Sequence, residues 1–122
     1  MPLNLGQQGE AIAAKHLCVK GYEIIATNWR CAYGEIDLIA RKDDLLIFVE
    51  VKTRRAATTE SALASISAAK RQKIISAVHH YLDEISTAEV DEPLWRIDVI
   101  AIAFGRSTLF TIDHVENAFD WE

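Results

Sequence analysis

Two neighbouring segments of alternating side chains, Gly34 to Arg41 and Leu45 to Lys52, place the strongest constraint on how this chain can fold. Both are rich in aliphatic residues, and the turn-like residues 42–44 between them predict an antiparallel β-hairpin. A slip of one residue in such a pair moves every side chain to the opposite face, so the pattern itself selects a register. Pairing Asp37 with Glu50 separates apolar from polar side chains best.

With Asp37 opposite Glu50, one face of the predicted hairpin becomes wholly apolar. That face pairs Ile36, Leu38 and Ala40 with Val51, Val49 and Ile47, while the other face also pairs Ile39 with Phe48 and Glu35 with Lys52. Facing Cβ atoms lie roughly 5 Å apart, so the two carboxylates repel each other unless a cation lies between them. Two carboxylates and a backbone carbonyl provide oxygen ligands of the kind that Mg²⁺ prefers. The register therefore predicts a divalent-cation site.

Lys52 follows Glu50 on the same strand face, about 7 Å further along the strand. From there its amine could hold or deprotonate a water molecule, or neutralise charge that develops on a phosphate. Glu-x-Lys triplets are also common on solvated strands, where they have no chemical role. Asp37 falls on the same face of the predicted hairpin as Glu50 and Lys52, which favours a catalytic site over a solvated surface here.

The motif reads Gly-Glu-Ile-Asp-Leu-Ile at residues 34–39 and Phe-Val-Glu-Val-Lys-Thr-Arg at residues 48–54. It resembles the PD-(D/E)xK nuclease superfamily, and specifically the bacterial YraN-like family, which is similar to archaeal Holliday-junction resolvases. The likeness extends to residues 9–10, 70–73, 96–99 and 114–119.

This resemblance implies a restriction-endonuclease-like α/β fold, a Mg²⁺ or Mn²⁺ ion held by Asp37, Glu50 and the carbonyl of Val51, and cleavage of DNA. Two features depart from the family pattern. Ile36 stands where the nominal motif has proline, and the loop at residues 55–61 lacks the Phe-Gly pair that relatives usually carry there.

A helix predicted from Gly6 to Val19, closed by Gly21, places Glu10 on the same face as buried-type residues such as Ala13 and Leu17. The matching glutamate of resolvase-like relatives serves the metal site, which implies that Glu10 is a third catalytic carboxylate, either as a metal ligand or through a metal-bound water. The alternative is an ordinary first-turn acid that the helix dipole favours.

Charge is distributed unevenly along the chain, although its net value is −5. The segment from Lys52 to Lys73 contains six basic residues and one acidic residue, Glu60, so its net charge is +5. The rest of the chain has a net charge of −10, and its excess acid lies mainly in residues 83–92 and the C-terminal tail. We predict that this segment binds nucleic acid through Arg54, Arg55, Lys70, Arg71 and Lys73, with Gln72 as a further substrate contact. A solvated helix and loop would show the same charge pattern.

The remaining segments complete a single α/β domain over residues 1–122. We predict strands at Tyr22–Trp29, Arg96–Phe104 and Leu109–Val115, the last at an edge, and a helix capped by Ser65 or Ser67 that ends near Ile85. The expected order is α-β-β-β-α-β-β, with a central mixed sheet flanked by helices and the strand at 96–104 parallel to a hairpin strand.

Several classes of protein are disfavoured. Cys18 and Cys31 are too few for a disulfide framework or a zinc site. The four histidines, at positions 16, 79, 80 and 114, form no ligand motif and are expected to be surface or half-buried residues. The chain shows no signal peptide or apolar run of membrane-spanning length, which predicts a cytoplasmic protein. Asp98, in an apolar strand, is expected to bond Arg96 or Arg54.

Two functional hypotheses follow. The first is a Mg²⁺- or Mn²⁺-dependent endonuclease acting on DNA, with branched or junction DNA as the candidate substrate, and a homodimer if it cuts two strands symmetrically. The second is a nucleic-acid- or protein-binding module that keeps the nuclease fold without useful turnover. Intact Asp37, Glu50 and Lys52 favour the first hypothesis, and the net acidity favours the second.

Overall fold

A computed structural model describes residues 2–86, 92–106 and 109–119. Its elements are α1 (Leu5–Val19), β1 (Glu23–Cys31), β2 (Gly34–Lys42), β3 (Leu45–Arg55), α2 (Glu60–Ala64), α3 (Ala68–Ile85), β4 (Leu94–Phe104) and β5 (Phe110–Val115). The predicted order is confirmed, except that the short helix α2 was not anticipated. Strands β1, β3 and β4 extend beyond their predicted bounds by two or three residues at one end.

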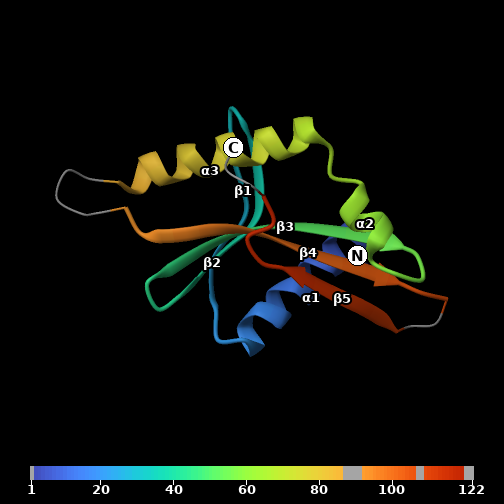
Figure 1. Cartoon of the computed structure of the whole chain (residues 1–122). Coiled ribbons are helices and arrows are strands. Elements are labelled where there is room, and N and C mark those ends of the chain that lie inside the picture. Colours follow the sequence, from blue (N-terminus) through green and yellow to red (C-terminus); the bar gives the residue numbers. More distant parts are fainter. Residues whose placement is uncertain (1, 87–91, 107–108, 120–122) are drawn as a thin grey trace.

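The five strands form one mixed sheet in the order β1-β2-β3-β4-β5 (Figure 1). Strands β1, β2 and β3 are antiparallel neighbours, β4 runs parallel to β3 after the helical crossover, and β5 closes the edge antiparallel to β4. Both the parallel pairing and the edge position of the last strand were predicted. The sheet with flanking helices is the α/β architecture expected of a restriction-endonuclease-like fold.

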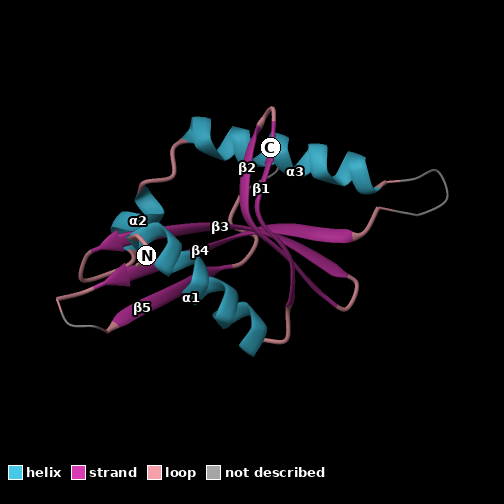
Figure 2. Cartoon of the chain, turned by 180° about the vertical axis from the view of Figure 1, so that it is seen from behind, coloured by secondary structure: helices cyan, strands magenta, loops and turns pink. Residues whose placement is uncertain are grey.

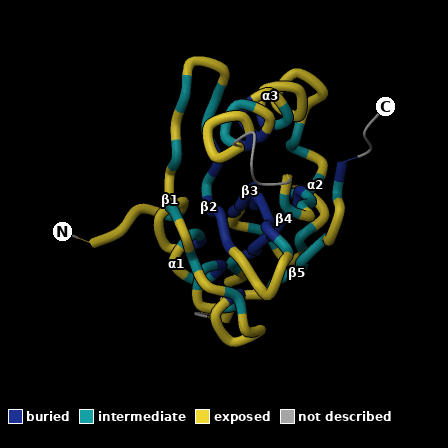
Figure 3. The backbone as a smooth tube through the Cα atoms, turned by 90° about the vertical axis from the view of Figure 1, so that its left-hand side faces the viewer, coloured by how far each residue is buried: buried dark blue, intermediate teal, exposed yellow. Residues whose placement is uncertain are grey.

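Helices cover both faces of the sheet, as the opposite views in Figures 1 and 2 show. Side chains of α3 such as Ile74, Val78 and Leu82 pack with Phe48 and Ile97 in one apolar cluster. The second cluster joins α1 to the other face through Ala13, Leu17, Leu38, Val49 and Ile100. Figure 3 shows that burial concentrates in β3 and β4, which explains their nearly continuous apolar sequences.

The helix ends follow from local sequence. Asn4 caps α1 in a reciprocal arrangement with Gln7, and Gly21 adopts a φ of +93° just after the helix. The hydroxyl of Ser67 accepts a hydrogen bond from the amide of Lys70 at 3.1 Å, so Ser67 caps α3 and Ser65 does not. This cap fixes the first turn of α3, which lies over the motif strands.

Helix α1 approaches β3 closely at Gly9. A Cβ atom at this position would overlap the hydroxyl of Thr53, which leaves no room for a larger residue. The contact holds the next residue, Glu10, beside the sheet. Within the described residues, no helix is long and apolar enough to cross a membrane.

Candidate active site

The candidate site lies where β2 and β3 stop pairing. The predicted register is confirmed by the pairs Leu38–Val49, Ile39–Phe48 and Ala40–Ile47. The backbone ladder ends at the first of these pairs. Beyond it, Oδ2 of Asp37 accepts a hydrogen bond of 2.8 Å from the amide of Val51. A carboxylate therefore bonds the β3 amide that would face β2 in a continued ladder.

This break in the ladder overturns two predicted details. Ile36 packs in the α3-side cluster with Ile39, not with Leu38 on the apolar face of the hairpin. Glu35 lies 3.6 Å from the guanidinium of Arg30 and is not paired with Lys52. Glu35 and Ile36 stay paired with β1 but not with β3, so the alternation of the β2–β3 ladder no longer sets their faces.

The two carboxylates share a pocket of about 370 Å³ between the sheet and α3. Gly34, Glu35, Asp37 and Glu50 line it from the sheet, and Ser67, Ala69, Lys70, Lys73 and Ile74 line it from the N-terminal part of α3. The Glu50 side chain is only 4% exposed, with Lys70 Nζ at 3.1 Å and Lys52 Nζ at 3.8 Å from its Oε1. Two cations thus stand beside one buried carboxylate.

The protonation equilibria of the site are strongly shifted. Burial, followed by the charge of Glu50, raises the pKa of Asp37 to about 7, although the Val51 amide opposes this rise. Burial and the neighbouring Lys70 lower the pKa of Lys52. Burial also opposes the charge of Lys70, but contacts with Lys52 and Glu50 outweigh it and raise the pKa of Lys70. The site therefore combines an acid whose pKa is raised, Asp37, with an amine whose pKa is lowered, Lys52.

Glu10 approaches from the α1 side. Its Oε2 lies 3.4 Å from the side-chain amide of Asn28, and burial followed by the charge of Asp37 raises its pKa. The helix face predicted for Glu10 is confirmed, since Ala13 and Leu17 on that face are buried. Across the described ranges, however, no three His, Cys, Asp or Glu side chains are grouped closely enough to hold a metal ion.

Oxygen donors for a cation are nevertheless available at the break. In an extended strand the amide and carbonyl of one residue point to the same side, and the Val51 amide points to Asp37. The carbonyl of Val51 therefore faces the gap that β2 leaves. Two carboxylates and this carbonyl form a set of hard oxygen donors, which suits Mg²⁺ or Mn²⁺.

The six residues predicted to bind nucleic acid occupy different places. Lys70 and Lys73 line the carboxylate pocket. Arg71 lies over the ring of Phe119 at 5.3 Å, and Gln72 is exposed on α3. Arg54 donates to the carbonyl of Thr53, whereas Arg55 lines a separate pocket at the end of β3. The acidic stretch was predicted partly on residues 87–91 and 120–122, which lie outside the described residues.

A buried ionic network around Asp98 was only partly anticipated. Arg96 bonds both carboxylate oxygens, at 2.9 and 3.2 Å, as predicted, and the alternative partner Arg54 is wrong. His114 Nε2 lies 2.8 Å from Asp98 Oδ2, and the amide of Asn117 donates to Oδ1 at 3.0 Å. Burial disfavours the Asp98 charge, but these partners outweigh it and lower the pKa of Asp98.

His114 is the residue that sequence analysis missed here. Its side chain is only 4% exposed, and its Nδ1 lies 3.1 Å from Lys20 Nζ and 3.3 Å from Nε2 of His16. The network thereby joins the C-terminal end of α1 to β4 and β5. A polar residue in an apolar strand signalled that Asp98 had an internal partner, but no spacing pattern identified His114.

Comparison with known proteins places the chain in a family. Residues 9–102 match the Uncharacterised protein family UPF0102. The chain belongs to this family. A UPF0102 protein of Roseiflexus castenholzii is 43% identical over 120 residues, which cover 95% of this chain and 93% of the relative.

Other UPF0102 relatives cover similar lengths. A protein of Chloroflexus aurantiacus is 44% identical over 111 residues, covering 91% of this chain and 88% of the relative. One from Myxococcus xanthus is 36% identical over 115 residues, covering 94% and 88%. The family match spans the candidate site from Glu10 to Lys73, so this site lies inside the domain that UPF0102 proteins share.

Proposed function

We propose that this UPF0102 protein is a Mg²⁺- or Mn²⁺-dependent endonuclease that hydrolyses phosphodiester bonds in DNA. The observation that carries the proposal is the apposition of Asp37 and Glu50, half-buried and buried, at the end of a β-ladder with Lys52 and Lys70 beside them. Such an arrangement raises the free energy of the folded protein through charge repulsion. A role in binding a cation and a phosphate explains why it is present.

Asp37, Glu50 and the carbonyl of Val51 would hold the divalent ion. When bound, the ion would neutralise charge on the scissile phosphate and make a water molecule more acidic. The pKa of Asp37, raised by burial and by Glu50, is one that a cation would bring down again. The donor set thus fits the ion both by ligand chemistry and by electrostatics.

Lys52 and Lys70 have different roles, because their pKa values are shifted in opposite directions. Lys52, whose pKa is lowered, is placed to accept a proton from the water that attacks phosphorus. Lys70, whose pKa is raised, stays charged and can donate hydrogen bonds to a phosphate oxygen. In the hydrolysis the oxygen of water bonds to phosphorus, and one bridging oxygen leaves with the electron pair of the broken P–O bond.

Glu10 and Lys73 lie at the borders of this site. Glu10 reaches it from α1 and can orient a water molecule near Asp37. Lys73, exposed at the rim of the pocket, can contact the phosphate that follows the scissile one. A pocket lined by lysines beside two carboxylates suits a DNA backbone, and branched DNA is the first substrate to test.

The deciding experiment is a cleavage assay in Mn²⁺ on a panel of linear and branched DNAs. Wild type is compared with Asp37→Ala, Glu50→Ala and Lys52→Ala, with Asp44→Ala in the exposed β2–β3 turn as the control. We expect each of the three changes to abolish cleavage, because the three residues act as one unit and the loss of any one costs about as much activity as the loss of all. The control should cleave normally. Full activity in any two site variants would refute this site.

One observation favours the second candidate function, a DNA-binding module without turnover. Lys70 already neutralises Glu50 at 3.1 Å, so a metal ion must displace or share this contact. The same assay decides between the two functions. DNA binding by wild type with no cleavage of any substrate in Mn²⁺ would favour the binding module.

A further inference from the structure

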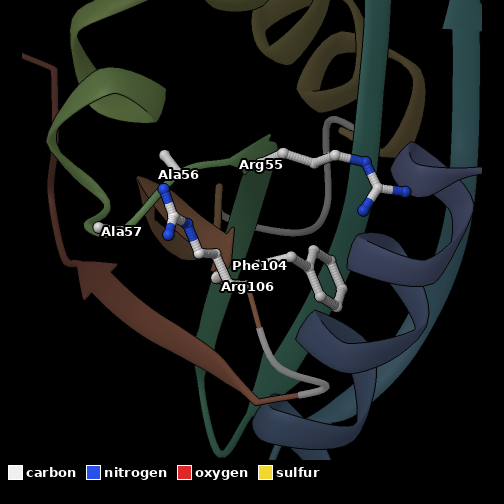
Figure 4. Close-up of a pocket in the computed structure, with 6 residues that line it drawn as sticks. Arg55, Ala56, Ala57, Phe104 and Arg106 are labelled. Carbon is white, nitrogen blue, oxygen red and sulfur yellow. The ribbon is translucent and has the colours of Figure 1, made fainter.

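A second, larger pocket opens at the C-terminal ends of the parallel strands β3 and β4 (Figure 4). Its volume is about 550 Å³, and it is lined by Arg55, Ala56, Ala57, Phe104, Gly105 and Arg106. None of these residues lines the carboxylate pocket. Arg55 lies five positions after Glu50 on β3, a distance of roughly 16 Å along the strand.

This pocket is positively charged in a protein that is negatively charged as a whole. Two arginines and no acidic residue line it, whereas the net charge of the chain is −5. Both arginines are exposed, and neither forms an ion pair with any residue that the structure describes. Their charges are therefore available to an anionic ligand.

The walls of the pocket are held by the fold. The amide of Ala56 donates to the carbonyl of Phe104 at 3.0 Å, which ties the loop after β3 to the end of β4. Phe104 packs against the α1-side cluster and lies 5.9 Å from the ring of Phe110. In Figure 4 Arg55 extends toward α1 and Arg106 toward Ala56, so that the two guanidinium groups flank Phe104.

We propose that this pocket binds phosphodiester groups of the DNA strand that extends from the candidate active site. The proposal rests on the proposed function and adds Arg106 to the DNA contacts. Guanidinium groups bind phosphate oxygens through paired hydrogen bonds, and the small side chains of Ala56 and Ala57 leave room for a backbone to approach. Strand β3 leads from Glu50 to Arg55, but Glu50 faces α3 and Arg55 extends toward α1, so the DNA strand would pass round the C-terminal end of β3 to reach both.

The separation of the two pockets along β3 sets the shortest length of DNA that can reach both. Duplex DNA rises about 3.4 Å per nucleotide of one strand, so 16 Å corresponds to about five phosphates. A substrate that reaches both pockets must therefore extend at least about five nucleotides to one side of the cleaved bond. Shorter substrates would contact the carboxylate pocket alone.

The test measures DNA binding without metal, so that no cleavage occurs. Fluorescence anisotropy in EDTA compares wild type with Arg55→Gln and Arg106→Gln on a 20-base-pair duplex whose ends carry no phosphate. Arg41→Gln is the matched control, because Arg41 is an exposed arginine at the opposite end of the hairpin, paired with Glu23 at 3.3 Å. Thermal melting confirms that all variants are folded.

We expect Arg55→Gln and Arg106→Gln each to weaken binding about tenfold and to reduce the salt-dependence slope by about 1, while the control does neither. Binding equal to that of the control would overturn the proposal. A loss seen only on a duplex with terminal 5′-phosphates would also overturn it, in favour of a terminal-phosphate site. Failure of wild type to cleave DNA in Mn²⁺ would refute the nuclease function and leave these binding results unchanged.

Discussion

Replacing Asp37 with asparagine should stabilise the protein in metal-free buffer, because the native site buries the Asp37 carboxylate and places it beside Glu50. Asparagine keeps an oxygen that can accept the hydrogen bond from Val51, and its amide can donate to Glu50. The rise of the Asp37 pKa from 3.8 to about 7 corresponds to at most about 4 kcal/mol of lost stability above pH 7, since one pKa unit is worth about 1.4 kcal/mol.

Burial contributes more to this rise than the charge of Glu50 does, and water in the pocket reduces both effects, so we expect Asp37→Asn to recover about 2 kcal/mol. For a chain of 122 residues this raises the melting temperature by about 8 °C. The advantage depends on pH in a defined direction. An acid whose pKa is raised by folding costs no stability below its unfolded value, and the cost grows as pH rises from about 4 to 7.

Mn²⁺ should reverse this order of stabilities. A ligand at a hundredfold excess over its dissociation constant stabilises the folded state by about 2.7 kcal/mol, and wild type should gain this while the Asp37→Asn variant gains little. Melting curves from pH 4 to 8, with and without Mn²⁺, measure both effects. Asp44→Asn, in the exposed turn of the same hairpin, controls for the loss of one charge.

Three results would contradict this reasoning. Equal melting temperatures of wild type and Asp37→Asn at pH 8 would show that the carboxylates do not repel each other in the folded protein. A difference that shrinks as pH rises would have the wrong sign. If Mn²⁺ stabilises both proteins equally, or neither, Asp37 and Glu50 do not share an ion.

Two further substitutions test the supports of the site. Gly9→Ala should destabilise the protein by about 1–3 kcal/mol in urea unfolding, because its Cβ would overlap Thr53. It should also reduce cleavage by displacing Glu10. Gly6→Ala is the control and should not destabilise the protein, because its Cβ meets only Asn4 at an ordinary 3.5 Å. His114→Ala should cost about 2–4 kcal/mol because it removes a partner of buried Asp98. His80→Ala should cost under about 1 kcal/mol, because His80 is half-buried and its ion pair is with exposed Glu84. An equal loss of unfolding free energy in Gly9→Ala and Gly6→Ala, or in His114→Ala and His80→Ala, would show that the buried contact of that pair does not stabilise the protein.

The hairpin register could be predicted because two alternating patterns had one mutually consistent alignment. Leu38 and Val49 are buried on the same face as that alignment requires. The same rule failed at Ile36, where the side chain of Asp37 replaces a backbone partner of β3. Alternation reports the faces of a continuous ladder, and nothing in it marks where the ladder ends.

Other features have no local signal at all. Helix α2 has five residues, which is too short to show helical periodicity. Asp98 and His114 meet across β4 and β5, and Arg106 reaches its pocket from the end of a strand. Contacts of this kind depend on how strands are placed beside each other. Sequence therefore predicted the carboxylate pair within one hairpin better than the groups around it.

The sheet order has a consequence for the folding pathway. All five strands stand in the sheet in the order in which they occur along the chain, so β1, β2 and β3 can pair through short loops before the crossover forms. Asp37 and Glu50 would then meet before α3 delivers Lys70 to Glu50. Repulsion between the Asp37 and Glu50 carboxylates would then be greatest in the transition state for folding. Stopped-flow refolding without metal should therefore be faster for Asp37→Asn than for wild type. An unchanged refolding rate with slower unfolding would instead place the meeting of the carboxylates after the barrier.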